Sequence, residues 1–408
     1  MISAETAHEH IRQCVQALPG VRVPLNNALG LCLVNAIVSD VDSPPFDKAL
    51  LDGYAISVKD KSPTLRITEQ VLAGGVPHHA VEPGTTIRVM TGAPIPDGAD
   101  AVIKHEDVHQ LKESLIQFPT KGVVEGGGIM SRGTSFHSGQ EVLPAGKSLT
   151  PIDLALIAEL GKAKVQVIPR PQVAVLATGN ELVDVGRPVG PAQICNSNGP
   201  MLLALLESQC VKTTDLGIGR DDPEMLHQLV QQGLKADVLL ITGGVSAGVM
   251  DLVPGVLEKL GVEKVFHKVR IKPGKPLWFG KQEKDGKSTY VFGMPGNPVS
   301  TLVSFELFVK PMLGMLGGRG YSTLSTMTGR LTDAKQYRGN RTTYFPCRIL
   351  YDAHARDKMP VELLPWGGSA DLAAMTRANA LAIFPAGDYE LPAGSEVEVL
   401  TLSSSNVI

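Results

Sequence analysis

The chain has 408 residues, of which 43% are hydrophobic and 19% charged, and its formal net charge at pH 7 is -3. This length predicts two to four domains, and the composition excludes a largely disordered protein. The net charge excludes a nucleic-acid partner that depends on a basic surface, and the absence of a long apolar run excludes an integral membrane protein with such a run. Five scattered cysteines without a CxxC spacing, and an N-terminus without a secretory pattern, favour a cytoplasmic protein that binds neither membrane nor nucleic acid.

The N-terminal forty residues predict a helix followed by short strands. Apolar residues recur at near-helical spacing from Ala7 to Leu18, and Pro19 and Gly20 end this run. From about residue 41 to residue 139 the pattern changes to short alternating segments between Gly and Pro turns. We expect this part of the chain to form a small all-β module.

A second helix and another strand follow the β module. Residues 151–160 predict a helix with Thr150 as its N-cap, and residues 164–168 predict a strand. This order predicts a discontinuous N-terminal domain with the β module inserted into it. The expected boundaries are residues 1–40 and 140–168 for the N-terminal domain and residues 41–139 for the inserted module.

Buried strands and helices alternate in residues 169–320. Asp222 is the expected N-cap of one helix, with Pro223 at its first position and an apolar face made by Met225, Leu226, Leu229, Val230 and Leu234. This alternation predicts a mostly parallel sheet with helices on both faces. Residues 321–408 return to a β pattern, so the predicted fold class is α/β plus all-β modules in an elongated multidomain chain. The strands expected around this α/β domain and in the tail lie at residues 172–176, 211–216, 237–241, 290–292, 342–349, 360–364, 380–384 and 396–402, and a further helix is expected at residues 300–313.

Three loops with glycines follow strands of the predicted parallel sheet, at residues 177–182, 242–251 and 293–300. Ligands bind at the carboxyl ends of the strands in such sheets. Glycines let backbone N–H groups approach a ligand, and the helix N-termini behind them favour anions. Each loop alone is compatible with a simple tight turn, but together they favour a phosphate-binding site. Neither a P-loop nor a GxGxxG sequence is present.

Acidic side chains accompany these glycines at Glu181, Asp221 and Asp251. Carboxylates repel phosphates unless a hard cation lies between them, and Mg²⁺ is commonly held by one or two carboxylates together with phosphate oxygens. Asp222 is expected to be occupied as an N-cap, which leaves Asp221 as the freer acid. The acids therefore favour a Mg²⁺-dependent phosphate site.

A basic segment lies in the sequence KVRIKPGKP, which begins at Lys268. If Val269 and Ile271 point into the core, the basic side chains between and beside them share the opposite face of the strand. A solvated strand face and an anion-binding face are about equally compatible with this pattern.

Eight sequence segments occur in one order along the chain: FDKALLDGYA, RVMTGAPIP, ATGNEL, QICNSN, GIGRDDP, TGGVSAGVMD, KPGKP and GMPGNPVS. Together they resemble the molybdopterin molybdenumtransferase family, which includes the C-terminal domain of gephyrin. The resemblance covers nearly the whole chain. It implies a homodimer of elongated four-domain subunits, the third domain having the molybdopterin-binding α/β fold. It also implies a reaction in which molybdate is inserted into adenylylated molybdopterin, with Mg²⁺-dependent release of AMP.

The resemblance assigns roles to individual positions. Asp52 and Thr91, from the β module, are implied to complete the site across the dimer interface. The full implied set comprises the catalytic residues Asp52, Thr91, Glu181, Asp221 and Asp251; the substrate-binding residues Thr178, Gly243, Gly244, Ser246, Gly248, Lys268, Lys272, Lys275, Pro295, Pro298, Arg341 and Ser369; and the Mg²⁺ ligands Asp221, Asp251 and Glu181.

The chain also departs from the family pattern. Residues 48–51 replace the Asn-Ser-Ala-Met portion of the usual FDNSAMDGYA, Asn180 replaces a commoner Asp, and Ser135 stands where the family commonly has an acid. Two alternatives therefore remain beside the transferase: a non-catalytic dimeric scaffold that binds partner proteins, and a relative that prefers tungstate. A molybdopterin adenylyltransferase and molybdenum-dependent client enzymes are the expected protein partners.

Overall fold

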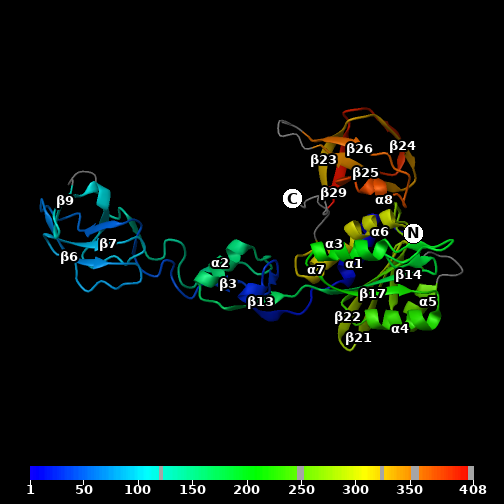
Figure 1. Cartoon of the computed structure of the whole chain (residues 1–408), viewed down its shortest axis with the longest axis horizontal. Coiled ribbons are helices and arrows are strands. Elements are labelled where there is room, and N and C mark those ends of the chain that lie inside the picture. Colours follow the sequence, from blue (N-terminus) through cyan, green and yellow to red (C-terminus); the bar gives the residue numbers. More distant parts are fainter. Residues whose placement is uncertain (119–122, 246–251, 322–325, 351–357, 403–408) are drawn as a thin grey trace. The chain divides into compact units, whose positions relative to one another are not determined.

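The computed structural model describes residues 1–118, 123–245, 252–321, 326–350 and 358–402. The chain forms two compact units (Figure 1). Unit 1 comprises residues 1–21 and 167–408, and unit 2 comprises residues 22–166. The N-terminal helix therefore belongs to the same unit as the α/β domain and the C-terminal β domain.

The N-terminal helix α1 (Ala4–Cys14) packs on the core of unit 1. The Ser3 side chain caps it by accepting a hydrogen bond from the Thr6 N–H at 3.1 Å, and Ala7 and Ile11 are fully buried. The helix ends at Cys14, earlier than the expected stop at Pro19, because Val15 is extended and buries its side chain in the same core.

A mixed six-stranded sheet forms the centre of unit 1, in the order β17-β14-β18-β22-β21-β19. The strands β17, β14, β18 and β22 are parallel, and β21 and β19 are antiparallel additions. This confirms the mostly parallel sheet. The strands are β14 (Gln172–Thr178), β17 (Lys212–Gly219), β18 (Val238–Thr242), β19 (Glu263–His267), β21 (Trp278–Lys284) and β22 (Lys287–Met294), with the short pair β15 (Leu182–Val183) and β16 (Ile194–Cys195) beside them.

Alternate residues of β14 enter two different cores. Val173 and Val175 pack with the core that includes α3 (Asn198–Ser208), whereas Ala174 and Leu176 pack with α4 (Pro223–Gly233) and α5 (Leu252–Lys259). The helices consequently cover both faces of the sheet, as Figure 1 shows. Helix α4 begins as predicted, with Asp222 accepting the Met225 N–H at 2.7 Å. Met225 itself is exposed, so the expected apolar face is narrower by that residue.

The longest helix runs from Pro298 to Leu316 as α6 (Pro298–Ser304), a π-helical turn (Phe305–Val309) and α7 (Lys310–Leu316). Of the described residues, these 19 are long and apolar enough, by length and composition, to cross a membrane. The structure buries 83% of the apolar window in unit 1, as expected for a core helix. It extends beyond the predicted residues 300–313 at both ends.

The C-terminal residues form a closed barrel in the strand order β25-β26-β23-β29-β27, with β27 pairing back onto β25. Strand β20 (Ile271–Lys272) joins this barrel from the α/β domain by pairing with β25. The described strands are β23 (Thr326–Leu331), β24 (Lys335–Gly339), β25 (Thr342–Ile349), β26 (Pro360–Leu363), β27 (Ala380–Phe384), β28 (Gly387–Leu391) and β29 (Glu396–Thr401), with the short helix α8 (Leu372–Met375); β24 and β28 form a separate antiparallel pair.

Unit 2 is built mostly from strands. Its main sheet has the order β8-β5-β7-β6-β10-β9, and a smaller sheet has the order β1-β13-β2. Helix α2 (Pro151–Glu159) begins at Thr150 with a reciprocal capping box to Asp153, as the sequence predicted for its start. The strands are β1 (Val21–Pro24), β2 (Cys32–Leu33), β3 (Ile37–Val38), β4 (Lys48–Ala49), β5 (Gly53–Ile56), β6 (Leu65–Val71), β7 (Thr85–Val89), β8 (Ala101–Lys104), β9 (His109–Lys112), β10 (Leu115–Gln117), β11 (Ile129–Met130), β12 (Glu141–Leu143) and β13 (Lys164–Ile168), with 3₁₀ turns at Leu25–Asn27 and His105–Asp107.

Candidate active site

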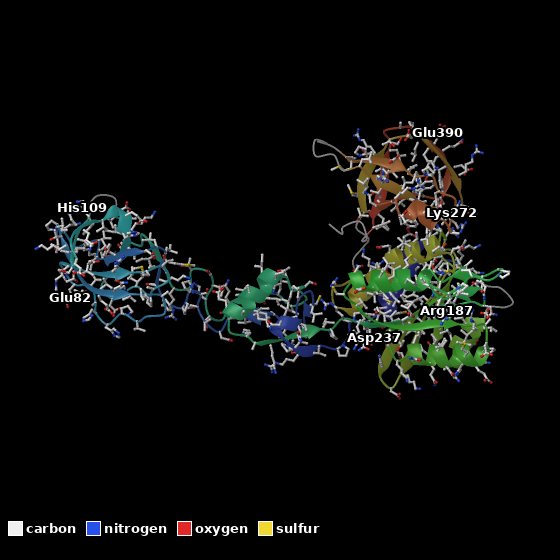
Figure 2. All side chains as sticks on the ribbon, viewed as in Figure 1. Glu82, His109, Arg187, Asp237, Lys272 and Glu390 are labelled. Atoms are coloured by element: carbon white, nitrogen blue, oxygen red, sulfur yellow. The ribbon has the colours of Figure 1, made fainter. Side chains whose placement is uncertain are left out.

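A cleft of about 960 Å³ lies in unit 1 between the carboxyl edge of the central sheet and the C-terminal barrel. Lys272 marks the place where the two meet (Figure 2). The lining residues come from both sides: Thr178, Glu181, Leu182, Ile194, Asn198, Thr242, Gly243, Lys272, Pro273, Gly274, Pro276, Pro295, Gly296, Asn297 and Ser300 from the α/β domain, and Lys335, Gln336, Tyr337, Arg338, Arg341, Thr343, Phe345, Trp366, Gly367, Gly368 and Ser369 from the C-terminal domain.

The sheet side of the cleft is made largely by backbone and short polar side chains. Thr178 ends β14 and donates its hydroxyl to the Thr242 carbonyl at 3.1 Å. Gly243 has a φ of 83°, and a Cβ there would clash with the Thr178 carbonyl oxygen. Gly244, with a φ of 62°, is crowded by the Thr178 hydroxyl and by Val253. These two glycines are thus required by the turn itself, and the Gly243 N–H is used within the sheet, where it donates to the Met294 carbonyl at 3.1 Å.

The basic segment has the predicted alternation. Val269 and Ile271 are fully buried, whereas Arg270 and Lys272 are exposed on the opposite side. Lys272 lines the cleft, but Lys268 and Lys275 are not among its lining residues. The structure therefore places one of the three predicted lysines at this cleft.

Three chain segments hold the basic segment in place. The N-terminal residue Ile2 forms a parallel bridge with Val269, in which the Ile2 N–H donates to the Lys268 carbonyl at 3.0 Å and the Arg270 N–H donates to the Ile2 carbonyl at 2.8 Å. The Lys268 N–H donates to the Leu277 carbonyl at 2.8 Å. Lys268 has a φ of 71°, which is strained for a residue with a side chain. Strand β20 then continues this segment into its pairing with β25.

On the barrel side, Arg341 and Ser369 are fixed near the sheet elements. One guanidinium nitrogen of Arg341 donates to the Ile271 carbonyl at 3.2 Å, and the Arg341 carbonyl accepts the Tyr337 hydroxyl at 2.6 Å. Ser369 accepts a hydrogen bond from the Asn297 side-chain amide at 3.0 Å, and its carbonyl accepts the Val299 N–H. The structure thereby brings Lys272, Arg341 and Ser369 to one cleft, although they are far apart in the sequence.

Pro295 and Pro298 shape the sheet-side loop that meets Ser369. Pro295 is buried, lines the cleft and accepts the Thr301 hydroxyl on its carbonyl at 2.6 Å, and Pro298 begins α6. Asn297 precedes this helix as predicted, but its side chain caps no helix N–H; its amide nitrogen donates to the Ser369 hydroxyl instead.

The loops that carry two of the predicted acids touch each other. Glu181 lines the cleft and is exposed; its neighbour Asn180 accepts the Asp221 N–H on its side-chain oxygen at 3.1 Å. The Arg220 guanidinium donates to the Leu182 carbonyl at 2.7 Å and so holds the first loop against the second. Asp222 is occupied as an N-cap and Asp221 is exposed, as predicted. Asp221 is not one of the lining residues of the cleft.

Asp251, Ser246 and Gly248 lie outside the described residues. Within the described part of the chain, no three His, Cys, Asp or Glu side chains converge in a metal-binding arrangement. The exposed carboxylates of Glu181 and Asp221 are of the type that holds Mg²⁺ together with substrate phosphates.

In unit 2 the structure joins the two segments that the sequence singled out. Asp52 accepts hydrogen bonds from the Thr91 N–H at 2.7 Å and the Thr91 hydroxyl at 2.8 Å. The Thr91 N–H and then its hydroxyl lower the pKa of Asp52, with smaller electrostatic contributions from the nearby His105 and Arg88 side chains. Next to it, a Cβ at Gly53 would overlap the Ile103 carbonyl, so only glycine fits. Asp52 is consequently an exposed, ionised carboxylate in a fixed position.

Ser135 lies in an exposed loop of unit 2, and two carboxylates from outside this loop accept hydrogen bonds from it. Its N–H donates to the Ser43 carbonyl at 2.9 Å. Asp42 accepts the Arg132 Nε at 2.6 Å, and Asp47 accepts the Arg132 N–H at 2.7 Å. The Ser138 N–H, followed by Arg132, lowers the pKa of Asp42. The loop is thus well fixed without a carboxylate at position 135.

Comparisons with known proteins agree along the whole chain. Residues 2–161 match the family model described as the MoeA N-terminal region (domain I and II), residues 174–314 the probable molybdopterin binding domain, and residues 328–402 the MoeA C-terminal region (domain IV). A molybdopterin molybdenumtransferase of Staphylococcus aureus (strain Mu50) is 31% identical over 99% of this chain and 96% of its own length. One from Haemophilus influenzae is 32% identical over 92% of each chain.

The chain belongs to the molybdopterin molybdenumtransferase family. Solved structures agree: two of the molybdopterin biosynthesis moeA protein from Pyrococcus horikoshii have TM-scores of 0.82 and 0.78, are 31% and 29% identical, and cover 98% of this chain and 99% and 100% of theirs. The chain is therefore a transferase of molybdenum cofactor biosynthesis, and the resemblance found in its sequence segments is confirmed.

Sequence reasoning missed several lining or supporting residues of the cleft. Arg220 stood inside the GIGRDDP segment, but nothing in that segment shows that its guanidinium binds carbonyl oxygens of another loop. Lys335, Phe345 and Trp366 lie in three separate parts of the C-terminal domain. The tertiary fold of the C-terminal domain brings them to one wall.

Proposed function

We propose that this protein inserts molybdenum from molybdate into adenylylated molybdopterin and releases AMP in a Mg²⁺-dependent reaction. The observation that carries the proposal is the single cleft that joins Lys272, Arg341 and Ser369 to the glycine-containing edge of a parallel sheet. Molybdate is a dianion, and the other substrate carries a phosphoanhydride. Both require positive charge and fixed N–H donors in one place.

We assign the oxyanion to the end of the cleft where sheet and barrel meet. Lys272 and Arg341 supply two positive charges, and Ser369 supplies a hydroxyl. The hydrogen bond from Arg341 to the Ile271 carbonyl and the one from Asn297 to Ser369 orient these groups before the anion arrives. A site oriented in this way binds the oxyanion without a large cost of reorganisation.

The phosphoanhydride belongs at the sheet edge, near Thr178 and Gly243. Glu181 and Asp221, together with Asp251, are the residues that would hold Mg²⁺. When bound, that cation neutralises charge on the phosphate oxygens and favours departure of AMP. Thr178 and the Gly243 turn line the sheet edge and leave it open to the phosphates. Arg220 keeps the Glu181 loop against the Asp221 loop.

The same proposal includes a cytoplasmic homodimer in which Asp52 and Thr91 of one copy complete the cleft of the other. Its support is the exposed position of Asp52 and the two hydrogen bonds from Thr91 that fix its carboxylate. A molybdopterin adenylyltransferase that supplies the substrate, and client enzymes that take the product, are the partners we propose.

The proposed contribution of Asp52 is tested with Asp52→Asn, which keeps the shape of the side chain and removes its charge. We expect AMP release to fall about tenfold or more while the melting temperature stays within a few degrees. Because the pKa of Asp52 lies below its usual value of about 3.9, the group is ionised throughout pH 5–7, and the substitution should lower activity equally across that range. A variant with unchanged turnover would remove Asp52 from the mechanism.

The reaction itself is tested by AMP release from adenylylated molybdopterin by purified protein with Mg²⁺, in the presence of no oxyanion, molybdate or tungstate at low concentration. Release that depends on molybdate and stops when Mg²⁺ is chelated supports the transferase. Release with tungstate at much lower concentrations than with molybdate would instead identify a tungstate-preferring enzyme. Tight substrate binding without release under any condition would favour the scaffold, for which the uncharged, exposed Ser135 is the motivating observation.

A further inference from the structure

The barrel side of the cleft has a wall that oxyanion binding does not explain. Lys335, Phe345 and Trp366 all line the cleft, and all three come from the C-terminal domain. The Phe345 and Trp366 rings meet edge to face, with centroids 5.3 Å apart and an interplanar angle of 82°. The Lys335 ammonium lies 4.4 Å from the centroid of the Phe345 ring. Two aromatic rings and a cation on the lining of a polar cleft fit a flat, heteroaromatic ligand.

Trp366 differs from an aromatic residue that only fills a core. It is partly exposed, and its indole nitrogen is buried without a hydrogen-bond partner among the residues that the structure describes. Buried indole N–H groups ordinarily have an acceptor. The other tryptophan, Trp278, is 3% exposed and belongs to the core between the sheet and α5. Trp366 packs partly against the core of unit 1 and also lines the cleft, whereas Trp278 does not line it.

The strand register fixes where this wall lies relative to the oxyanion end. Lys272 of β20 pairs with Thr343 of β25, and Phe345 is two residues further along β25. Residues i and i+2 of a strand share a face and are roughly 7 Å apart. Both Thr343 and Phe345 line the cleft. Phe345 therefore lies roughly 7 Å along β25 from the residue that pairs with Lys272.

We propose that Phe345 and Trp366, with Lys335 beside them, form the seat of the pterin ring system of the substrate. The proposal rests on the proposed function and identifies which part of the substrate the barrel recognises. In molybdopterin the dithiolene that receives the metal lies on a pyran ring fused to the pterin. A substrate whose dithiolene is beside Lys272 consequently has its pterin within reach of Phe345 and Trp366. The adenine is separated from the dithiolene by the phosphoanhydride, which the sheet edge accommodates.

Direct binding is measured with 6-carboxypterin alone, without molybdate, nucleotide or turnover. This probe is fluorescent, and it absorbs in the range where indole emits, so both its own polarisation and the quenching of Trp366 report on binding. We expect Trp366→Ala and Phe345→Leu to weaken binding about tenfold and Trp366→Phe, which retains a ring, about twofold. Arg348→Ala is the matched control, because Arg348 lies on β25 and is not among the lining residues of the cleft.

The outcomes separate pterin from adenine. Quenching of Trp366 by 6-carboxypterin, with no response to AMP at equal concentration, is the expected result. A response to AMP alone would overturn the proposal and place adenine at the wall. Equal binding of 6-carboxypterin to wild type, Trp366→Ala and Phe345→Leu, or no binding to the full chain at millimolar concentration, would overturn it as well.

Steady-state kinetics provide a second test. If the wall seats the pterin, Trp366→Ala raises KM for adenylylated molybdopterin about tenfold and leaves KM for molybdate near its original value. A purely structural role would change both constants together with the melting temperature. A separate outcome is that the wild-type protein binds 6-carboxypterin at Trp366 and yet releases no AMP in response to molybdate or tungstate. That result would contradict the proposed function and leave the pterin seat standing.

Discussion

The two walls of the cleft in unit 1 are built by different means. The sheet wall consists of tight backbone turns, such as Gly243 after β18, and of short polar side chains. The barrel wall consists of long side chains, Arg341, Phe345 and Trp366, which reach the cleft from separate strands and loops. A wall of glycine turns and short polar side chains leaves the sheet edge open to a bulky phosphoanhydride. A wall of rings and cations suits a flat ring and a compact oxyanion, and a substrate with both parts requires both walls.

The largest effect is expected where the walls meet. Lys272→Ala removes a charge that the proposal places on the oxyanion, and we expect kcat/KM for molybdate to fall about 100-fold in the AMP release assay. Arg270→Ala is the matched control, since Arg270 is exposed two residues away and its N–H to Ile2 is retained. Similar losses in both variants would mean that the basic segment acts through its overall positive charge. That result would contradict the assignment of the oxyanion to Lys272 at the meeting point of the two walls.

A substitution on the sheet wall tests whether its backbone is rigid. Gly243→Ala places a Cβ against the Thr178 carbonyl at a φ of 83°, and we expect a loss of about 3 kcal/mol in unfolding free energy. Gly186→Ala has a similar φ of 86° with no atom within 4 Å of the added Cβ, so about 1 kcal/mol is expected there. Chemical denaturation of the two variants measures the difference. Equal losses would show that the Thr178 contact does not constrain the turn.

On the barrel wall, Asp371 holds the loop that carries Trp366 and Ser369. Its carboxylate accepts the Gly367 N–H at 2.9 Å and the Ala374 N–H at 3.0 Å, and these bonds lower its pKa. We expect Asp371→Ala to weaken binding of both 6-carboxypterin and molybdate about fivefold. Because the folded pKa is lowered, the carboxylate is protonated only as the pH falls below its usual value of about 3.9, so the loop should not respond to pH between 5 and 7. A titration of pterin binding centred in that range would contradict this assignment.

The smallest effect is expected from the N-terminal bridge to the basic segment. Ile2→Pro removes the N–H that donates to the Lys268 carbonyl and keeps the carbonyl that accepts from Arg270. We expect KM for molybdate to rise about threefold with little change in kcat, because Lys272 is then less well fixed. Ile2→Val preserves both hydrogen bonds and is the control. If the two variants behave alike, the bridge contributes only to folding.

The sequence predicted the sheet wall far better than the barrel wall, and the reason lies in the distance along the chain. The N-cap at Asp222 and the burial of Val269 and Ile271 can be predicted from the residues next to them in the sequence, and the structure confirms these predictions. The strands β24 and β28, by contrast, alternate polar residues with tyrosines and gave no clear apolar pattern. The early end of α1 at Cys14 reflects tertiary packing of Val15, which spacing alone does not show.

The same reason explains which site residues the sequence assigned. Lys272, Glu181 and Gly243 stand in compact segments whose composition indicates an anion site. Phe345 and Trp366 stand among ordinary barrel residues, and their common position depends on pairing between β20 and β25 and on closure of the barrel. Lys268 and Lys275 were assigned to the site because they share a segment with Lys272. The structure does not place them among the lining residues of the cleft, so nearness in the sequence was not sufficient here.

The most direct test of the account is a diffraction measurement at the molybdenum absorption edge on crystals soaked in molybdate. The account predicts an anomalous peak within hydrogen-bonding distance of the Lys272 ammonium, the Arg341 guanidinium and the Ser369 hydroxyl. That peak should be lost in Lys272→Ala and retained in Trp366→Ala. A peak at another place, or none at a molybdate concentration that saturates AMP release, would contradict the assignment of this cleft as the place where the metal is transferred.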